Sequence, residues 1–306
     1  MIRPAAFDYN PETAATNSMQ TAVQQPPAAG LRSHNELAQA EFQSLVRALE
    51  SEGVRVCAVD DTPVPPKPDA VFPNNWVTFH VDGTVVLYPM HAANRRRERR
   101  REVIDAVAAR TGFRVSRVVD LSHHELQGRC LEGTGSLVLD HVNRVAYASE
   151  SPRTHPAVVA EWTQEFGYEA VVFRAVDRAG APVYHTNVLM CIGEGFAVVG
   201  TSAIVPEDRG RVGERLKASG REIIEIDASE IEHFAGNMLE LASWDEALGD
   251  YRVLVLSANA RQSLKAESFA RLSACTDTVL AVPIPTIETL SGGSVRCMLA
   301  EIFLPT

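Results

Sequence analysis

Residues suited to covalent catalysis stand at the start of short apolar segments along the chain. They are Asn74-Asn75 before WVTFHV, Glu132 before SLVLD, His185 before NVLMCIG, Asn237 in NMLEL and Cys297 in CMLAEIF. A thiol can act as a nucleophile when an imidazole and a carboxylate move protons beside it. Each residue also has a structural explanation when taken alone, because a cysteine in an apolar strand is often a small buried hydrophobe. Their common position in five segments favours one shared catalytic site.

The segments that must position these residues repeat one order of strand, strand, helix and strand. The four continuous copies span 76–121, 136–176, 187–227 and 237–284. Their helices are expected at 94–111, 155–167, 206–219 and 260–274. The fifth copy joins both ends of the chain and combines 297–305, 2–7, 34–52 and 54–59. Five copies closed in this way predict a ring with the first strands around its axis, so the polar residues converge at one end of that axis.

Composition and charge restrict the class of protein. The 306 residues carry a net charge of −10, which argues against a nucleic-acid partner. The arginine-rich run 95–101 is interpreted mostly as a solvated helical face. There is no apolar run of about 18 residues that would cross a membrane, and the N-terminus does not resemble a signal peptide. A cytoplasmic enzyme is the expectation.

The cysteines and histidines give no pattern for a metal site. The five cysteines are irregularly spaced and form no CxxC, so we expect reduced thiols rather than disulfides or structural zinc. His91 and the pair His123-His124 could ligate a metal, but no second ligand lies at a convincing spacing, so we interpret them as surface residues. Neither a metal nor an organic cofactor is expected.

Six segments resemble motifs of the guanidino-group-modifying superfamily, which contains amidinotransferases, arginine deiminases and dimethylarginine hydrolases. They are DAVFPNNW (69–76), ANRRRE (93–98), LEGTGSLVLD (131–140), SPRTH (151–155), YHTNV (184–188) and SGGSVRCML (291–299). The glycine-rich approach to Cys297 is the most specific match, and the resemblance covers nearly the whole chain. It implies an α/β fold, the five-bladed propeller called a pentein with pseudo-five-fold ββαβ repeats, and a single catalytic domain over 1–306.

The resemblance also implies roles for individual residues. Cys297 would form a covalent adduct, His185 would move protons, and Glu132 would support the histidine or contact a substrate nitrogen. Asp69 would belong to the substrate pocket, and Arg95 and Arg153 would hold the substrate carboxylate, which suits an arginine fork. We give Asn237 equal weight as a substrate contact and as a cap of its strand. Asn10 and Asn17 would lie in an N-terminal loop over the pocket.

The first motif departs from that of dimethylarginine hydrolases in a way that bears on the substrate. Where those enzymes have D-x-V-F-x-E-D, this chain has Asn74 and Asn75 in place of the two final acids. An amide both donates and accepts hydrogen bonds without charge, so it suits a neutral ureido group better than a guanidinium. The pattern, including PAAFDYNPETAATN, is similar to citrulline-utilisation hydrolases. We therefore predict hydrolysis of citrulline to ornithine, ammonia and carbon dioxide.

Two alternatives remain open. The first is an arginine deiminase or dimethylarginine dimethylaminohydrolase on the same scaffold, and the second is a non-catalytic amino-acid-binding relative. In the catalytic interpretation, protonated His185 or a cationic substrate would help to ionise Cys297, since a free thiol is mostly protonated at neutral pH. Asn74 or Asn75 would stabilise the oxyanion. The expected partner is a small amino-acid substrate, and a homodimer is compatible with the sequence, which does not define the oligomeric state.

Overall fold

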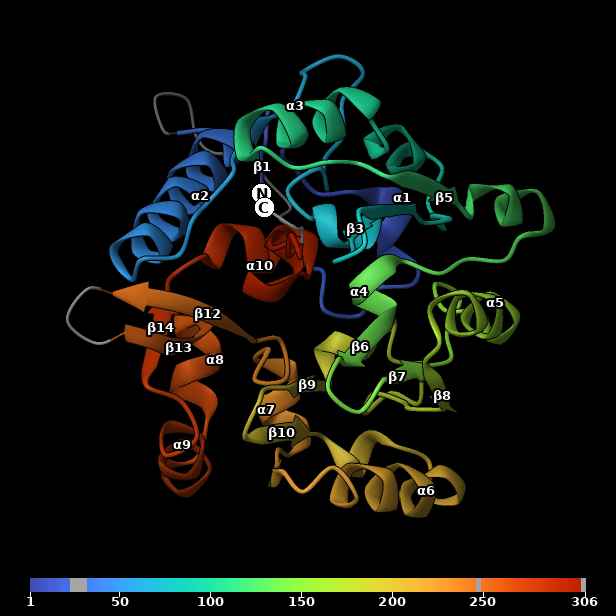
Figure 1. Cartoon of the computed structure of the whole chain (residues 1–306), viewed down its shortest axis with the longest axis vertical. Coiled ribbons are helices and arrows are strands. Elements are labelled where there is room, and N and C mark those ends of the chain that lie inside the picture. The colour runs from blue at the N-terminus through green and yellow to red at the C-terminus, as the bar shows by residue number, and fades with distance from the viewer. Residues whose placement is uncertain (23–31, 246–248, 304–306) are drawn as a thin grey trace.

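Five small sheets surround a central axis in the computed structural model, which describes residues 1–22, 32–245 and 249–303 (Figure 1). In each three-stranded sheet, the middle strand is antiparallel to the first strand and parallel to the third. A parallel return needs a crossover, and here a helix on the rim makes it. The predicted five-bladed α/β propeller is confirmed.

Four blades contain the complete strand, strand, helix and strand unit. The first has β3 (Val77–Phe79), β4 (Thr84–Leu87), α3 (Arg101–Thr111) and β5 (Arg117–Asp120). The second has β6 (Leu137–Asp140), β7 (Val145–Ser149), α5 (Pro156–Phe166) and β8 (Glu169–Phe173). The third has β9 (Met190–Ile192), β10 (Phe196–Val199), α6 (Pro206–Lys217) and β11 (Glu222–Glu225). The fourth has β12 (Leu239–Asp245), β13 (Gly249–Ser257), α8 (Ala258–Ser263), α9 (Ala266–Ser273) and β14 (Thr278–Val282).

The fifth blade is shorter than the sequence predicted. It contains β1 (Ile2–Arg3), α2 (His34–Ser51) and β2 (Val59–Asp60), and β1 and β2 are parallel. The segment expected as its first strand, 297–305, makes one bridge in its described part, from Ile302 to Phe79 of the neighbouring blade. Its start is a 3₁₀ turn, because the backbone N–H groups of Cys297 and Leu299 donate to the carbonyls three residues earlier, of Ser294 and Arg296, instead of to a neighbouring strand. Residues 304 and 305 of that prediction lie outside the described residues.

Short turns and helices connect the blades. They are α1 (Pro11–Ala14), η1 (Pro73–Asn75), η2 (Asn94–Glu98), η3 (Ser122–Gln127), α4 (Gly133–Ser136), η4 (Thr186–Val188), η5 (Thr201–Ala203), α7 (Ala228–Glu232), α10 (Pro285–Ser291) and η6 (Val295–Met298). The helix expected over 94–111 is therefore divided into η2 and α3. Arg100 between them is extended, and the 3₁₀ geometry of η2 aligns Arg95 with Glu98 on one side.

Apolar patterning explains why the rim helices pack where they do. The middle strands β7 and β10 are buried throughout, as expected for strands covered on both faces. Helix α5 buries Val158, Val159 and Trp162 against its blade and ends at Gly167, whose φ of 66° favours glycine. Figure 1 shows α2, α3, α5, α6 and α9 on the outside, with α4 and α10 nearer the axis.

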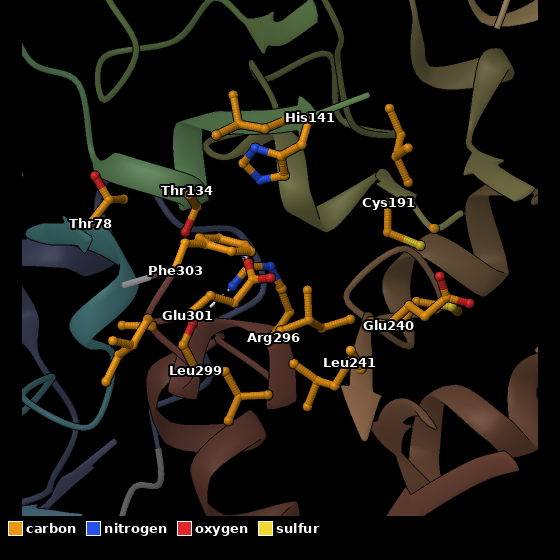
Figure 2. Close-up of a pocket in the computed structure, with 18 of the residues that line it drawn as sticks. Thr78, Thr134, His141, Cys191, Glu240, Leu241, Arg296, Leu299, Glu301 and Phe303 are labelled. Carbon is orange, nitrogen blue, oxygen red and sulfur yellow. Dashed lines mark hydrogen bonds and ion pairs between the residues drawn. The ribbon is translucent and has the colours of Figure 1, made fainter. Parts of the chain in front are cut away.

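A cavity of about 720 Å³ lies among the first strands of the blades, which confirms that these strands surround the axis. Its wall includes residues of β3, β6, β9 and β12 together with the C-terminal residues 299–303. Figure 2 labels Arg296, Glu301, Phe303 and Thr134 among the residues that line this cavity. Among the described helices, none is both long and apolar enough to cross a membrane.

A buried hydroxyl joins the first two blades. Tyr88 follows β4, and its Oη accepts a hydrogen bond of 2.8 Å from Trp162 Nε1 and lies 2.7 Å from Thr78 Oγ1. We predict that Tyr88→Phe lowers the free energy of unfolding by about 1–3 kcal/mol, because the indole N–H loses its partner inside the core. Chemical denaturation measures this loss.

Tyr168→Phe is the matched control for this prediction. Its hydroxyl lies 2.8 Å from His141 Nδ1 at a partly exposed site, so water can replace it and the loss should be smaller. Equal losses in the two variants would contradict a structural role for the Tyr88 hydroxyl.

Candidate active site

Short turns that precede the first strands carry most of the predicted site residues. Asn74 and Asn75 lie in η1, Glu132 precedes α4, His185 precedes η4, and Cys297 lies in η6. Helix α4 packs against both η1 and η4. Close packing requires Gly133, which has a φ of 46° and where a Cβ would lie 2.1 Å from the carbonyl oxygen of Asn74. The fold therefore brings these residues to neighbouring positions near the axis.

A hydrogen bond joins the two predicted acid/base residues. His185 Nε2 lies 2.8 Å from Glu132 Oε2, and Glu132 Oε1 accepts from the backbone N–H of His91 at 3.0 Å. Burial alone would raise the pKa of Glu132, but the charge of Arg153 and the hydrogen bond from His185 hold it well below its usual range. Glu132 is therefore an ionised acceptor, and His185 donates to it through Nε2–H.

Burial favours the neutral form of His185. Burial lowers its pKa to about 4, and the opposing effect of Glu132 is smaller. Because Nε2 carries the proton, Nδ1 holds the free lone pair. A Cβ on Gly135 would lie 2.8 Å from His185 Nδ1 and 2.5 Å from Asn75 Nδ2, so the absence of a side chain at Gly135 leaves room between these groups. The lowered pKa of His185 disfavours an imidazolium at neutral pH and so argues against protonated His185, one of the two expected sources of charge, as the group that ionises the thiol.

The sulfur of Cys297 is contacted by two amides. Asn237 Nδ2 lies 3.3 Å from Sγ and Asn187 Nδ2 lies 3.7 Å from it. Asn237 is oriented by its Oδ1, which accepts from the backbone N–H of Arg296 at 3.0 Å. These two asparagines, and not His185, are the hydrogen-bonding partners of the thiol within the described part of the chain. Amide donors aimed at sulfur stabilise negative charge there.

Asn187 was missed by the sequence reasoning, although a signal for it existed. It lies in YHTNV two residues after His185, at the opening of the third unit, as Asn237 opens the fourth. Its position places the histidine segment directly beside the nucleophile. Asn237 donates both to the thiol at 3.3 Å and to the carbonyl of Asn187 at 3.1 Å. It therefore does more than cap its strand.

Arg95 is buried but its fork is already occupied. Its Nε and Nη2 donate to the carboxylate of Glu98, each at 2.9 Å, and its Nη1 donates to Asn75 Oδ1 at 2.8 Å. Nε also lies 3.8 Å from Asp69 Oδ2. In this structure Arg95 therefore positions Asn75 and lies near Asp69, instead of presenting a free two-point contact for a carboxylate. Glu98 was missed, and its spacing of three residues from Arg95 was the available signal.

Two polar atoms of the predicted site residues lack partners within the described part of the chain. They are Asp69 Oδ1, an acceptor, and Asn74 Nδ2, a donor. Burial raises the pKa of Asp69, although Arg95 acts in the opposite direction. Unpaired buried polar groups cost free energy, so a bound substrate that supplies their partners would be stabilised here.

The N-terminal segment covers the site. Asn10 donates to Asp69 Oδ2 at 2.7 Å, and Arg153 donates to the carbonyl of Thr13 at 3.0 Å and to Thr16 Oγ1 at 2.9 Å. Asn17 donates to the carbonyl of Ser291 at 2.9 Å. Asp69, Glu132, His185 and Cys297 are consequently 1–3% exposed. The predicted position of Asn10 and Asn17 over the pocket agrees with these contacts.

The fold and the family comparison place the chain in the guanidino-group-modifying superfamily, whose fold is the pentein. A family model described as N,N dimethylarginine dimethylhydrolase, eukaryotic, matches residues 3–304. The chain belongs to that family. No curated protein sequence matches the chain significantly.

Solved structures show the same fold at low sequence identity. The arginine dihydrolase ArgZ from the ornithine-ammonia cycle in cyanobacteria is 18% identical to this chain, with a TM-score of 0.74. The match covers 100% of this chain and 40% of the ArgZ chain. The N-terminal domain of ArgZ is 17% identical with a TM-score of 0.73, covering 99% of this chain and 98% of that domain. A dimethylarginine dimethylaminohydrolase, solved as an adduct with 4-chloro-2-hydroxymethylpyridine, is 19% identical with a TM-score of 0.58. The match covers 85% of this chain and 89% of that enzyme's chain.

The depressed pKa of His185 predicts a pH-dependent stability. Between pH 6.5, the usual pKa of histidine, and about pH 4, His185 is protonated in the unfolded chain but not in the folded protein. The free energy of unfolding therefore falls as the pH falls through this window. From pH 7 to pH 5, wild type should lose about 2 kcal/mol more than His185→Gln, which lacks the titrating group. Denaturant titrations of both proteins at the two pH values measure this difference. Parallel losses would show that His185 is not held neutral.

Proposed function

We propose that this protein is a cysteine-dependent hydrolase that converts citrulline to ornithine, ammonia and carbon dioxide. The observation that carries the proposal is the uncharged pair Asn74 and Asn75 beside a complete Cys297, His185 and Glu132 set. Asn75 is held by Arg95 at Oδ1 and by Asn74 at Nδ2, where it donates to Asn74 Oδ1 at 3.0 Å. The pair therefore presents amide dipoles in place of two carboxylates.

The unpaired atoms of the site complement a ureido group. A ureido oxygen only accepts hydrogen bonds, whereas its nitrogens donate them. Asn74 Nδ2 is an unpaired donor and Asp69 Oδ1 is an unpaired acceptor, so citrulline offers a partner for each. A guanidinium offers donors alone and would leave the Asn74 amide unsatisfied.

The first half of the reaction forms the covalent adduct. Neutral His185 accepts the thiol proton at Nδ1, and Glu132 stabilises the resulting imidazolium through Nε2–H. The Cys297 thiolate attacks the ureido carbon, and the carbonyl electron pair moves to oxygen. Amide donors of the site, including Asn74 Nδ2, stabilise that oxyanion. The imidazolium then protonates the δ-nitrogen, the carbon–nitrogen bond breaks, and ornithine leaves a carbamoyl thioester on Cys297.

The second half restores the enzyme. His185 Nδ1 accepts a proton from water as the water oxygen attacks the thioester carbon. The carbon–sulfur bond breaks, and the thiolate recovers the proton. The carbamate product decomposes to ammonia and carbon dioxide. The two amides beside sulfur, Asn187 and Asn237, stabilise the thiolate in both halves.

Arginine is the second candidate substrate, favoured by the charge balance of the buried site. Asp69, Glu98 and Glu132 are three buried acids, whereas Arg95 and Arg153 are two buried cations. If all five are ionised, their net charge is −1, which a guanidinium would neutralise. Burial opposes full ionisation of these acids: it raises the pKa of Glu98 to about 7 and also raises that of Asp69. Protonation of these carboxylates can therefore balance the charge instead of a guanidinium. ArgZ is described as an arginine dihydrolase, and a mutant of AgrE was solved in a binary complex with L-arginine.

The proposed enzyme acts as one catalytic domain in the cytosol. Its five cysteines are all free, which suits a reducing compartment. Substrate entry requires the N-terminal segment to release Asp69 and Arg153, because the catalytic residues are closed from solvent with that segment in place.

A product assay tests the proposal. Wild type incubated with citrulline should release ornithine, and Cys297→Ser should reduce the rate by at least about 10³-fold because a hydroxyl lacks the nucleophilicity of the thiolate. Amino-acid analysis with citrulline, arginine and methylated arginines identifies the substrate. Citrulline as the end product from arginine, with no ornithine from either, would establish a deiminase instead. No product from any of them would favour the non-catalytic alternative.

The isosteric variant Asn75→Asp tests the role of the amide pair. It adds a negative charge beside Arg95 and removes an amide donor. We predict that the ratio of kcat/KM for citrulline to that for arginine falls by about 10- to 100-fold, equivalent to about 1–3 kcal/mol. The ratio within one variant is its own control for folding and active-site concentration. An unchanged ratio would contradict the assignment of substrate preference to this pair.

A further inference from the structure

A cluster of potential metal ligands lies outside the candidate active site. His123 and His124 are in η3, and Glu161 is on the outer helix α5. One ligand atom from each of these three side chains lies within 4.8 Å of the other two. From the sequence the two histidines had no further ligand at a suitable spacing, and the fold supplies the third residue. We propose that His123, His124 and Glu161 bind a divalent transition-metal ion of the zinc class.

The hydrogen bonds around the cluster favour coordination over a simple surface pair. His123 Nδ1 lies 3.2 Å from the carbonyl oxygen of Asp120, so Nδ1–H can donate and Nε2 keeps its lone pair. A ligating histidine is commonly oriented by such a contact of its other nitrogen. His124 Nε2 lies 2.8 Å from Glu161 Oε2, which already places an imidazole beside a carboxylate.

The buried histidine also has an unsatisfied position. His124 is 6% exposed, and its Nδ1 has no hydrogen-bond partner among the described residues. A buried ring nitrogen without a partner costs free energy. That nitrogen points away from Glu161, so Nε2 is the His124 atom that can share an ion with the carboxylate, and the ring of His123 lies with its centroid 4.2 Å from that of His124.

The donor set selects the class of ion. Two imidazoles and one carboxylate are ligands of zinc in sites that keep an open fourth position, with bonds of about 2.0–2.2 Å. Tetrahedral coordination at that length separates ligand atoms by about 3.4 Å, so separations of up to 4.8 Å must shorten by as much as about 1.4 Å, while the 2.8 Å contact of His124 with Glu161 must widen. His123 and Glu161 are exposed and can move by that amount. Calcium and magnesium prefer oxygen ligands and fit this set poorly.

The experiment is calorimetric titration of Zn²⁺ into Cys297→Ser, a background that removes the active-site thiol as a competing ligand. One equivalent should bind, and both His123→Ala and Glu161→Gln should weaken binding by at least about 10-fold, because each removes one of three ligands. His233→Ala is the matched control, since this exposed histidine follows α7 and its Nδ1 lies 2.7 Å from the carbonyl oxygen of Ser229 in that helix, away from the cluster. It should leave the affinity unchanged.

A second readout follows the same proteins without any substrate. Bound Zn²⁺ should raise the unfolding temperature of the Cys297→Ser background in proportion to the logarithm of its concentration, and the rise should disappear in both ligand variants. Absence of binding in that background, or binding that neither variant weakens, would overturn the proposal. Weakening by His123→Ala but not by Glu161→Gln would also overturn it, because the carboxylate would then not be a ligand.

Discussion

The hydrogen bond between Glu132 and His185 is the contact on which the site depends. It joins turns from two blades, and it determines which ring nitrogen is free because an ionised Glu132 can only accept. Without this bond, a buried imidazole could present either tautomer to the pocket. The propeller contributes by bringing α4 and η4 into contact, which places the pair beside the amides that contact Cys297.

Burial makes the electrostatics of the site interdependent. Glu132 lies 3.6 Å from Arg153 Nη1 and 3.8 Å from Arg95 Nη1, and each arginine has further partners that hold it in place. Arg153 is secured by the N-terminal segment, so the cover over the site also fixes a cation that keeps Glu132 ionised. Opening this segment would therefore alter the environment of the acid/base pair as well as admit substrate.

Periodicity and motif together predicted the propeller, because each blade contains short apolar strands that are recognisable locally. They also indicated Glu132, His185, Asn237 and Cys297, which share one position in the repeat. Glu98 and Asn187 were missed although their spacing offered a signal, since an occupied arginine fork and a sulfur contact across blades are defined only by the three-dimensional arrangement. Glu161 is similar, because its distance along the chain from His124 conceals their contact at 2.8 Å. The C-terminal strand was overpredicted because an apolar sequence pattern does not by itself ensure pairing: the described part of this segment makes one bridge, and Phe303 is exposed.

The most direct measurement is single-turnover peptide mapping with citrulline labelled at its ureido carbon. Acid quenching traps a thioester, and mass spectrometry locates the label along the chain. We predict a transient carbamoyl group on Cys297 that forms as ornithine is released and disappears as carbon dioxide is produced. Release of ornithine with the label on a different cysteine, or with Cys297 unmodified throughout the turnover, would contradict covalent catalysis by this thiol.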